Sequence, residues 1–188
     1  MVADLGLDQV LLYRFDPRRH SLKPSDPPFV KVARGSGPRH IAFHPSGRFF
    51  YVINELASTI TVFSFDRLAE LQTVKTLPGN FSGENSTAEI VMHPSGKFLY
   101  GSNRGHDTIA VFAVDQAKGT LSLLEYVSTR GKTPRNFEID PTGQWLLVAN
   151  QNSNSIAVFR VIAGTGNLRP AELIENVPAP TCIRFASR

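Results

Sequence analysis

The chain has 188 residues, a net charge of +4 and a pI of about 9.5, with 14 glycines, 13 prolines and 13 phenylalanines. Its single cysteine, Cys182, excludes an internal disulfide, and no apolar run reaches the ~20 residues that span a membrane. The basic residues are scattered, with no run longer than Arg18-Arg19, so we expect neither nucleic acid nor membrane as a partner. The charge suits a pocket for a small anion. The lone cysteine and the lack of a signal-peptide pattern predict a cytoplasmic location.

The first element, VADLGLDQVLLYRFD, is a shortened copy of a unit that follows three more times. The constant Asn of the full copies recurs after 49 and then 47 residues, at Asn54, Asn103 and Asn150. Each full unit begins with a short strand and then a turn, HPSG, HPSG or DPTG, whose second-position Pro and fourth-position Gly predict a type I turn between two strands. An alternating third strand and a more polar fourth strand complete the unit.

Four antiparallel strands every ~40–50 residues are typical of a β-propeller blade. The sequence therefore predicts an all-β fold, a propeller with about four blades' worth of strands and no helix; a β-sandwich is the alternative, but sandwiches do not repeat this closely. We expect a single partial domain: an incomplete first blade (1–36), three blades (37–86, 87–133 and 134–179) and a lone inner strand (180–188).

The lone strand matches the inner strand that the first blade lacks, so it could close a four-bladed ring or pair with another chain. An open arc would instead leave apolar blade faces exposed, and chains would then associate through these faces. If residues 180–186 pair as an inner strand, Cys182 is shielded.

Two kinds of residue in the repeat are expected to have a structural role. His44 and His93 begin the first two turns, but Asp140 replaces them in the third, and an Asp at the start of a turn bonds the backbone of that turn. The constant Asn of each unit is expected to bond backbone at the end of its strand.

The residue after the constant Asn varies, as Glu55, Arg104 and Gln151. Because the first two strands of a blade form a hairpin, this position lies at the same rim as the start of the first strand, opposite the turn. First strands line the central channel of a propeller, so the ionisable residues of this rim should converge at one mouth: Arg39, His40, Glu55, Glu89, Arg104 and Arg135.

Three long segments, beginning GPRHIAFHPSG, STAEIVMHPSG and TPRNFEIDPTG, resemble the propeller-type lactonase family. That family includes the propeller class of 6-phosphogluconolactonase and the fungal carboxymuconate lactonizing enzyme. The resemblance covers the whole chain and implies a seven-bladed fold of about twice this length, of which the chain matches the C-terminal half. Blades that curve for a ring of seven do not suit a ring of four, so the resemblance implies an open arc in a monomer. It also implies a site of one His, two Arg and one Glu. Arg39, Glu55 and Arg104 match three of these, whereas the His lies upstream of this chain.

The resemblance implies a cytoplasmic hydrolase of carbohydrate metabolism, in the pentose phosphate pathway, that opens a sugar-acid lactone such as 6-phosphogluconolactone without a metal or other cofactor. In this hypothesis Arg39 and Arg104 bind the anion and stabilise developing charge, and Glu55 is the general base on water. Further substrate-binding residues are His40, Glu89, Arg135 and Gln151. The chain has no GxSxG nucleophile motif, which argues against a covalent acyl-enzyme.

Two alternatives remain open at this point. A calcium-dependent lactonase would use oxygen ligands from Asn54, Glu55, Asn103 and Asn150, although Arg104 would place a cation where the metal sits. A non-catalytic propeller would offer its loops and blade faces as an interaction scaffold.

Overall fold

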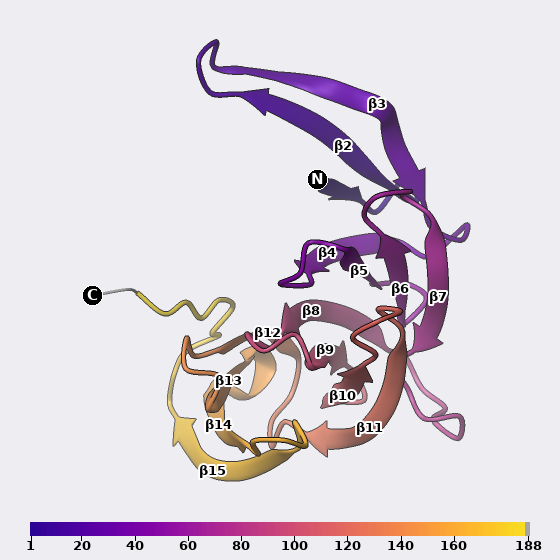
Figure 1. The fold of residues 1–188 in the computed structure, drawn as a ribbon. Coiled ribbons are helices and arrows are strands. Elements are labelled where there is room, and N and C mark those ends of the chain that lie inside the picture. The colour runs from indigo at the N-terminus through magenta and orange to yellow at the C-terminus, as the bar shows by residue number, and fades with distance from the viewer. Residues whose placement is uncertain (187–188) are drawn as a thin grey trace.

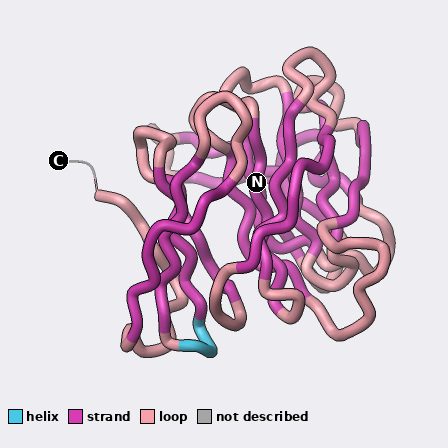
Figure 2. Tube along the Cα trace, turned by 90° about the horizontal axis from the view of Figure 1, so that it is seen from below, coloured by secondary structure: helices cyan, strands magenta, loops and turns pink. Residues whose placement is uncertain are grey.

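The computed structural model describes residues 1–186, which form the all-β fold that the repeat predicts. Fifteen strands account for nearly all of the regular structure, and the one helical element of the described chain is a single 3-10 turn, Gln151–Ser153. Figure 2 shows the strands running between loops at two opposite rims. No helix among these residues has the length and apolar character needed to cross a membrane.

Four antiparallel sheets follow one another along the chain, and each strand pairs with its neighbours in sequence. The first sheet has three strands: β1 (Val2–Asp4), β2 (Gln9–Asp16) and β3 (Ser21–Lys31). The second has four: β4 (Pro38–Phe43), β5 (Phe49–Asn54), β6 (Thr59–Ser64) and β7 (Glu70–Lys75). The third has β8 (Ser86–Met92), β9 (Phe98–Arg104), β10 (Thr108–Val114) and β11 (Leu121–Ser128). The last has β12 (Pro134–Ile139), β13 (Trp145–Asn150), β14 (Ser155–Val161) and β15 (Leu168–Glu175).

The sheets are arranged as blades around an incomplete axis. The first strands of the three full blades, β4, β8 and β12, lie innermost and contact one another in turn, while β7, β11 and β15 lie at the outside. Figure 1 shows the result as an open arc, with the N-terminal hairpin of β2 and β3 and the C-terminal segment on either side of the opening. The open arc expected for a monomer is therefore confirmed.

The repeated turns join the first two strands of each full blade. Gly47, Gly96 and Gly143 each donate a backbone N–H to the carbonyl of the residue that begins the turn, at 2.8–2.9 Å. His44 Nδ1 accepts the N–H of Ser46, so Nε2 carries the ring proton and donates to Gly96 O of the next blade at 3.1 Å. Its counterpart His93 makes the same contact to Gly143 O. Both histidines are structural, as the exchange for Asp140 predicts.

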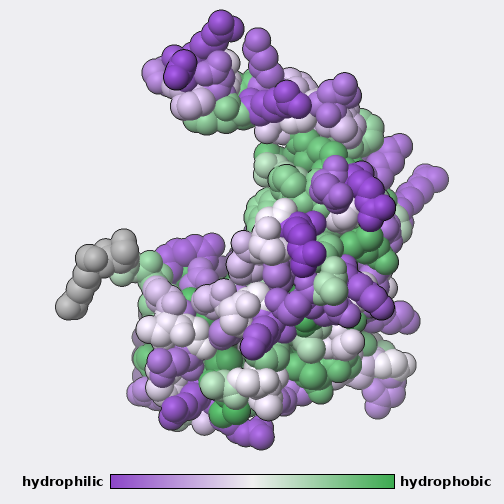
Figure 3. All heavy atoms as spheres, viewed as in Figure 1, coloured by the Kyte–Doolittle hydropathy of each residue, from purple (hydrophilic) through white to green (hydrophobic). Residues whose placement is uncertain are grey.

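Apolar side chains of facing blades pack together in three clusters. Two buried tyrosines add polar links between blades, because Tyr51 Oη donates to Gly119 O and Tyr100 Oη donates to Gly166 O of the following blade. In the last blade Leu147 occupies the corresponding place on the open side and is half-buried. Figure 3 shows the concave side of the arc, where the row of packed blades ends.

The lone inner strand expected at 180–188 is not formed in the described part of the chain, because residues 177–186 carry no strand and residues 187–188 lie outside the described residues. The segment does lie beside β12: Ile183 N–H donates to Asn136 Oδ1 at 2.7 Å, and Arg184 pairs with Glu138. An inner strand needs a second strand to form a ladder, and β1 lies at the other end of the arc. Cys182 is accordingly exposed rather than shielded.

Candidate functional site

The constant asparagines fix the ends of the second strands, where the variable residues follow. All three are fully buried. Asn54 Nδ2 donates to the hydroxyls of Thr59 and Thr61, Asn103 Nδ2 donates to Thr76 O, and Asn150 Nδ2 donates to Thr129 O. The expected bonds to backbone are present for Asn103 and Asn150, whose partners lie at the end of the preceding blade, whereas Asn54 bonds two hydroxyls of its own blade instead.

Backbone hydrogen bonds hold Glu55, the residue after Asn54, from two blades. Its N–H donates to Gly37 O at 2.7 Å within its own blade, and its carbonyl accepts Thr87 N–H from β8 of the next. Gly37 is required beside it: its φ is +63°, and a Cβ there would lie 2.6 Å from Cγ of Leu56. The Glu55 side chain is thus directed by the junction of two blades.

Glu55 bridges two arginines. Arg39 Nη1 donates to Oε2 at 2.7 Å, and Arg104 Nη2 donates to Oε1 at 2.5 Å. The Arg104 amine also donates to Thr87 O. The exposed fractions of the three side chains are 21% for Arg39, 16% for Glu55 and 13% for Arg104. The structure therefore brings together the three residues predicted to be catalytic.

A β-bulge accounts for the direction of Arg39. The register of β4 with β5 shifts between Pro38 and His40, so Arg39 has no partner in the ladder. Bulges of this kind re-aim a side chain at the end of a strand. Arg135 lies in the same bulge of β12, between Pro134 and Asn136.

Each arginine has guanidinium N–H groups without an acceptor among residues 1–186. The guanidinium amines Arg39 Nη2 and Arg104 Nη1 bond to no residue within 1–186, and neither is fully enclosed. The buried Nε atoms of both arginines also have no protein partner in that range. Guanidinium groups with unused donors bind planar or tetrahedral anions.

Burial alone would raise the pKa of the Glu55 carboxyl, but hydrogen bonds from Arg39 and Arg104, and their charges, hold the pKa below its ordinary value. Glu55 is therefore ionised at neutral pH. Both of its oxygens are already engaged by guanidinium groups, which makes it a better anchor for the arginines than an acceptor for a proton from water.

A second pair of ionisable side chains crosses the same blade boundary. His40 Nδ1 lies 2.7 Å from Glu89 Oε1, and Glu89 Oε2 accepts Asn136 Nδ2 at 2.5 Å. The Glu89 side chain is 7% exposed, whereas that of His40 is 41% exposed. His40, Glu89 and Asn136 stand at the same place in successive units, and the contact of Asn136 with the C-terminal segment was not predicted.

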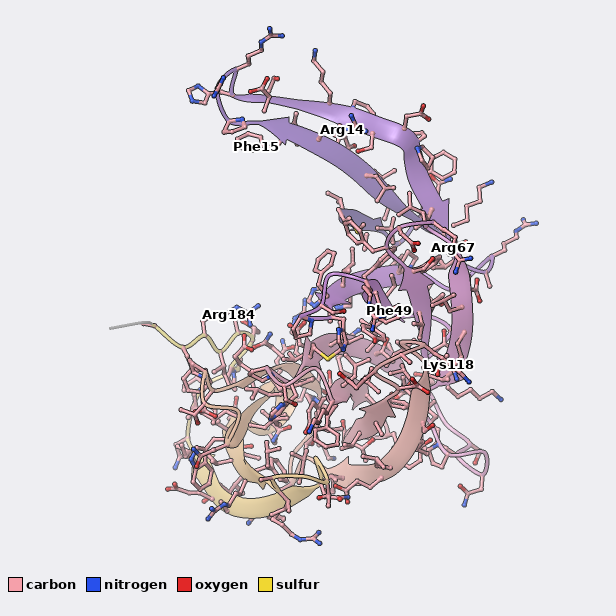
Figure 4. The ribbon with its side chains drawn as sticks, viewed as in Figure 1. Arg14, Phe15, Phe49, Arg67, Lys118 and Arg184 are labelled. Atoms are coloured by element: carbon pink, nitrogen blue, oxygen red, sulfur yellow. The ribbon has the colours of Figure 1, made fainter. Side chains whose placement is uncertain are left out.

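Two hollows lie beside these pairs. One, of about 360 Å³, is lined by Arg39, His40, Glu89 and Arg184 with apolar neighbours. The other, of about 770 Å³, is lined by Arg104, Gly105, Thr133 and residues 83–86. Figure 4 shows Arg184 on the C-terminal segment at the open side of the arc, while Arg67 and Lys118 lie at the outside.

The structure does not bring every predicted residue into this group. Arg135 is half-buried, and its side chain makes no hydrogen bond or ion pair within residues 1–186. Gln151 begins the 3-10 turn, where its backbone N–H donates to Thr133 O, and its side chain bonds to no described residue. As substrate contacts both remain predictions.

The calcium ligand set does not fit this geometry. All three asparagines are buried, with their amides bonded to other blade residues, and Glu55 faces two cations. Across residues 1–186 no three His, Cys, Asp or Glu side chains group as a metal site would require.

Comparison with known proteins gives a family match over residues 1–185, to the lactonases with a 7-bladed β-propeller. A 6-phosphogluconolactonase of Bacillus subtilis is 34% identical over 195 residues, covering 98% of this chain and 53% of the relative. Another, from Sodalis glossinidius, is 36% identical over 143 residues, covering 74% of this chain and 43% of the relative.

The structure of a periplasmic gluconolactonase from Pseudomonas aeruginosa superposes with a TM-score of 0.92 at 38% identity, over 98% of this chain and 53% of that chain. The chain thus spans about half the length of the curated relatives and solved structures it matches.

Proposed function

Because the chain belongs to the lactonase family of seven-bladed β-propellers, we propose that it carries the anion-binding part of a site that hydrolyses a sugar-acid lactone. The observation that carries this proposal is the bridge from Glu55 to Arg39 and Arg104 across a blade boundary. Relatives named 6-phosphogluconolactonase and gluconolactonase support the substrate class.

The arginines supply the two interactions that lactone opening requires. Attack of water on the ester carbonyl places negative charge on its oxygen, and a preorganised guanidinium stabilises that charge. A phosphorylated or carboxylated lactone brings a second anion, which a second guanidinium binds. The free amines of Arg39 and Arg104 are donors for these two groups, and 6-phosphogluconolactone is the substrate we propose.

Glu55 keeps the two guanidinium groups in position in this proposal. Holding two like charges side by side requires an anion between them when no substrate is bound. An ionised Glu55 meets that need at neutral pH, since its pKa is lowered. The general-base role expected from the family resemblance suits it less well, because each carboxylate oxygen already accepts a short hydrogen bond.

The proposal is tested by lactone hydrolysis followed with a pH indicator, using 6-phosphogluconolactone and δ-gluconolactone, with the spontaneous rate subtracted. Arg39→Gln should lower kcat/KM by about 10²–10³-fold, the usual loss when one donor to a developing oxyanion is removed. Arg67→Gln is the matched control, because its side chain is 75% exposed and lies at the outside of the arc. Equal kcat/KM values for the two variants would contradict the proposal.

A further inference from the structure

The pair of His40 and Glu89 lies beside the arginine pair but has a different chemical character. Glu89 is a buried carboxylate, while the His40 ring is partly exposed and lines the 360 Å³ hollow together with Arg39. A histidine held by a buried carboxylate at the wall of a cavity is the usual arrangement for proton transfer.

Hydrogen bonds to neighbouring backbone fix the direction of every donor in this network. Ile183 N–H, which is always a donor, points at Asn136 Oδ1, so the amide nitrogen of Asn136 faces Glu89. Ile90 N–H donates to Glu89 Oε1. Both donors favour the ionised form of the Glu89 carboxyl, which only accepts hydrogen bonds, so His40 donates through Nδ1–H.

A neutral imidazole with its proton on Nδ1 has a lone pair on Nε2. Nε2 of His40 has no partner among residues 1–186. The chain offers a contrast at His44 and His93, whose two ring nitrogens are both engaged in turn and inter-blade contacts. His40 is thus equipped to accept a proton, whereas Glu55 beside it has both oxygens occupied.

We propose that His40 is the general base of lactone opening and that Glu89 is its positioning residue; this inference rests on the lactonase function proposed above. Nε2 takes a proton from water while the water oxygen bonds to the carbonyl carbon and the π pair moves to the carbonyl oxygen, held by Arg39. When that pair re-forms the double bond, the ring C–O bond breaks, and protonated His40 returns the proton to the leaving alkoxide. The products are a hydroxyl and a carboxylic acid, and His40 is regenerated.

The kinetic test compares His40→Gln, Glu89→Gln and the control His20→Asn in the hydrolysis of 6-phosphogluconolactone. His20 lies exposed in the turn between β2 and β3, remote from the site. His40→Gln should lower kcat by about 10²–10⁴-fold with KM within about threefold of the unmodified protein, and His20→Asn should change neither. Glu89→Gln should lower kcat less, because Nε2 stays in place.

Nitrogen-15 NMR of the histidine rings supplies a readout that does not depend on turnover. We expect His40 protonated on Nδ1 in the unmodified protein, and a mixture of tautomers after Glu89→Gln, with the signals of His44 and His93 unchanged. Exogenous imidazole should also restore part of the rate of a His40→Gly variant.

The outcomes separate the two proposals. If the unmodified chain opens no lactone faster than buffer, the proposed function fails and the role of His40 fails with it. If the chain is active but His40→Gln retains its kcat, or if His40 carries its proton on Nε2, the inference alone is overturned and the base must lie elsewhere.

Discussion

Replacement of Glu55 by Gln tests how much the central bridge contributes to the fold. Gln has nearly the same shape and keeps one acceptor oxygen, but its NH2 group faces a guanidinium that had a carboxylate oxygen at 2.5–2.7 Å. Breaking a buried ion pair by removing one partner costs about 3–5 kcal/mol. Because the Glu55 side chain is 16% exposed, solvent screening reduces that cost, and we expect a loss of about 2–3 kcal/mol in unfolding free energy.

Urea unfolding of the variant at pH 7 measures this loss, with Glu138→Gln as the control. Glu138 pairs with Arg184 at 2.6 Å, but the Arg184 side chain is 61% exposed, so that pair contributes at most about 1 kcal/mol. The reasoning is refuted if Glu55→Gln unfolds within 0.5 kcal/mol of the unmodified protein (about the additivity error of such measurements).

The difference should depend on pH in one direction. The pKa of Glu55 is lower in the folded chain than its ordinary value of 4.5, so its ionised form contributes stability above that value, and the contribution is lost as pH falls through the folded pKa. The gap between Glu55→Gln and the unmodified protein should therefore be full at pH 7 and shrink below about pH 4. A gap that widens on acidification would contradict the ion-pair account.

Three further predictions concern the frame and the ends of the arc. Asn103→Ala removes a buried side chain that donates to Thr76 O and accepts from Thr76 Oγ1, and should cost about 2–4 kcal/mol in unfolding free energy, against little for the exposed Asn152→Ala. Cys182 should react with a thiol reagent almost as fast in native as in urea-unfolded protein, since it is exposed; slow native labelling would mean that residues 180–186 pair as a strand. Open blade faces should drive association that light scattering detects as species larger than one chain, and a stable monomer at high concentration would contradict this.

The fold could be predicted from the sequence because the information is local and repeated. HPSG and DPTG specify a turn within four residues, and strand alternation on either side specifies which side chains are buried. The open arc was expected from the resemblance to a seven-bladed family, because blades that curve for a ring of seven do not suit a ring of four. The terminal strand could not be settled in the same way, because its pairing depends on a partner strand that the local sequence of residues 180–186 does not contain.

The sequence predicts which residues lie at the candidate site but not which of them contact one another. The repeat aligns Glu55 with Arg104 and places both at one rim, which is enough to expect them near each other. The rotation between neighbouring blades decides whether a given carboxylate contacts an arginine or a histidine. The pattern of a single sequence does not encode that rotation angle. The structure pairs Glu55 with two arginines and Glu89 with His40, and neither pairing was predicted from the sequence.

Spacing nevertheless explains why the charges gather at one boundary. The links from Glu55 to Arg104 and from His40 to Glu89 each join residues 49 positions apart, one repeat period, so each connects equivalent places on neighbouring blades. At the next boundary the link from Glu89 to Asn136 persists, but Gln151 stands where a charge would be needed to pair with Arg104.

Both side-chain links therefore cross the junction between the blade of β4–β7 and the blade of β8–β11, where a large apolar cluster is also packed. Packing in this cluster sets the distance between the inner strands β4 and β8, and with it the distance between each acid and its base. A proton acceptor and an anion clamp assembled from two blades exist only while those blades are packed. Substitutions that loosen this cluster should consequently impair both groups together.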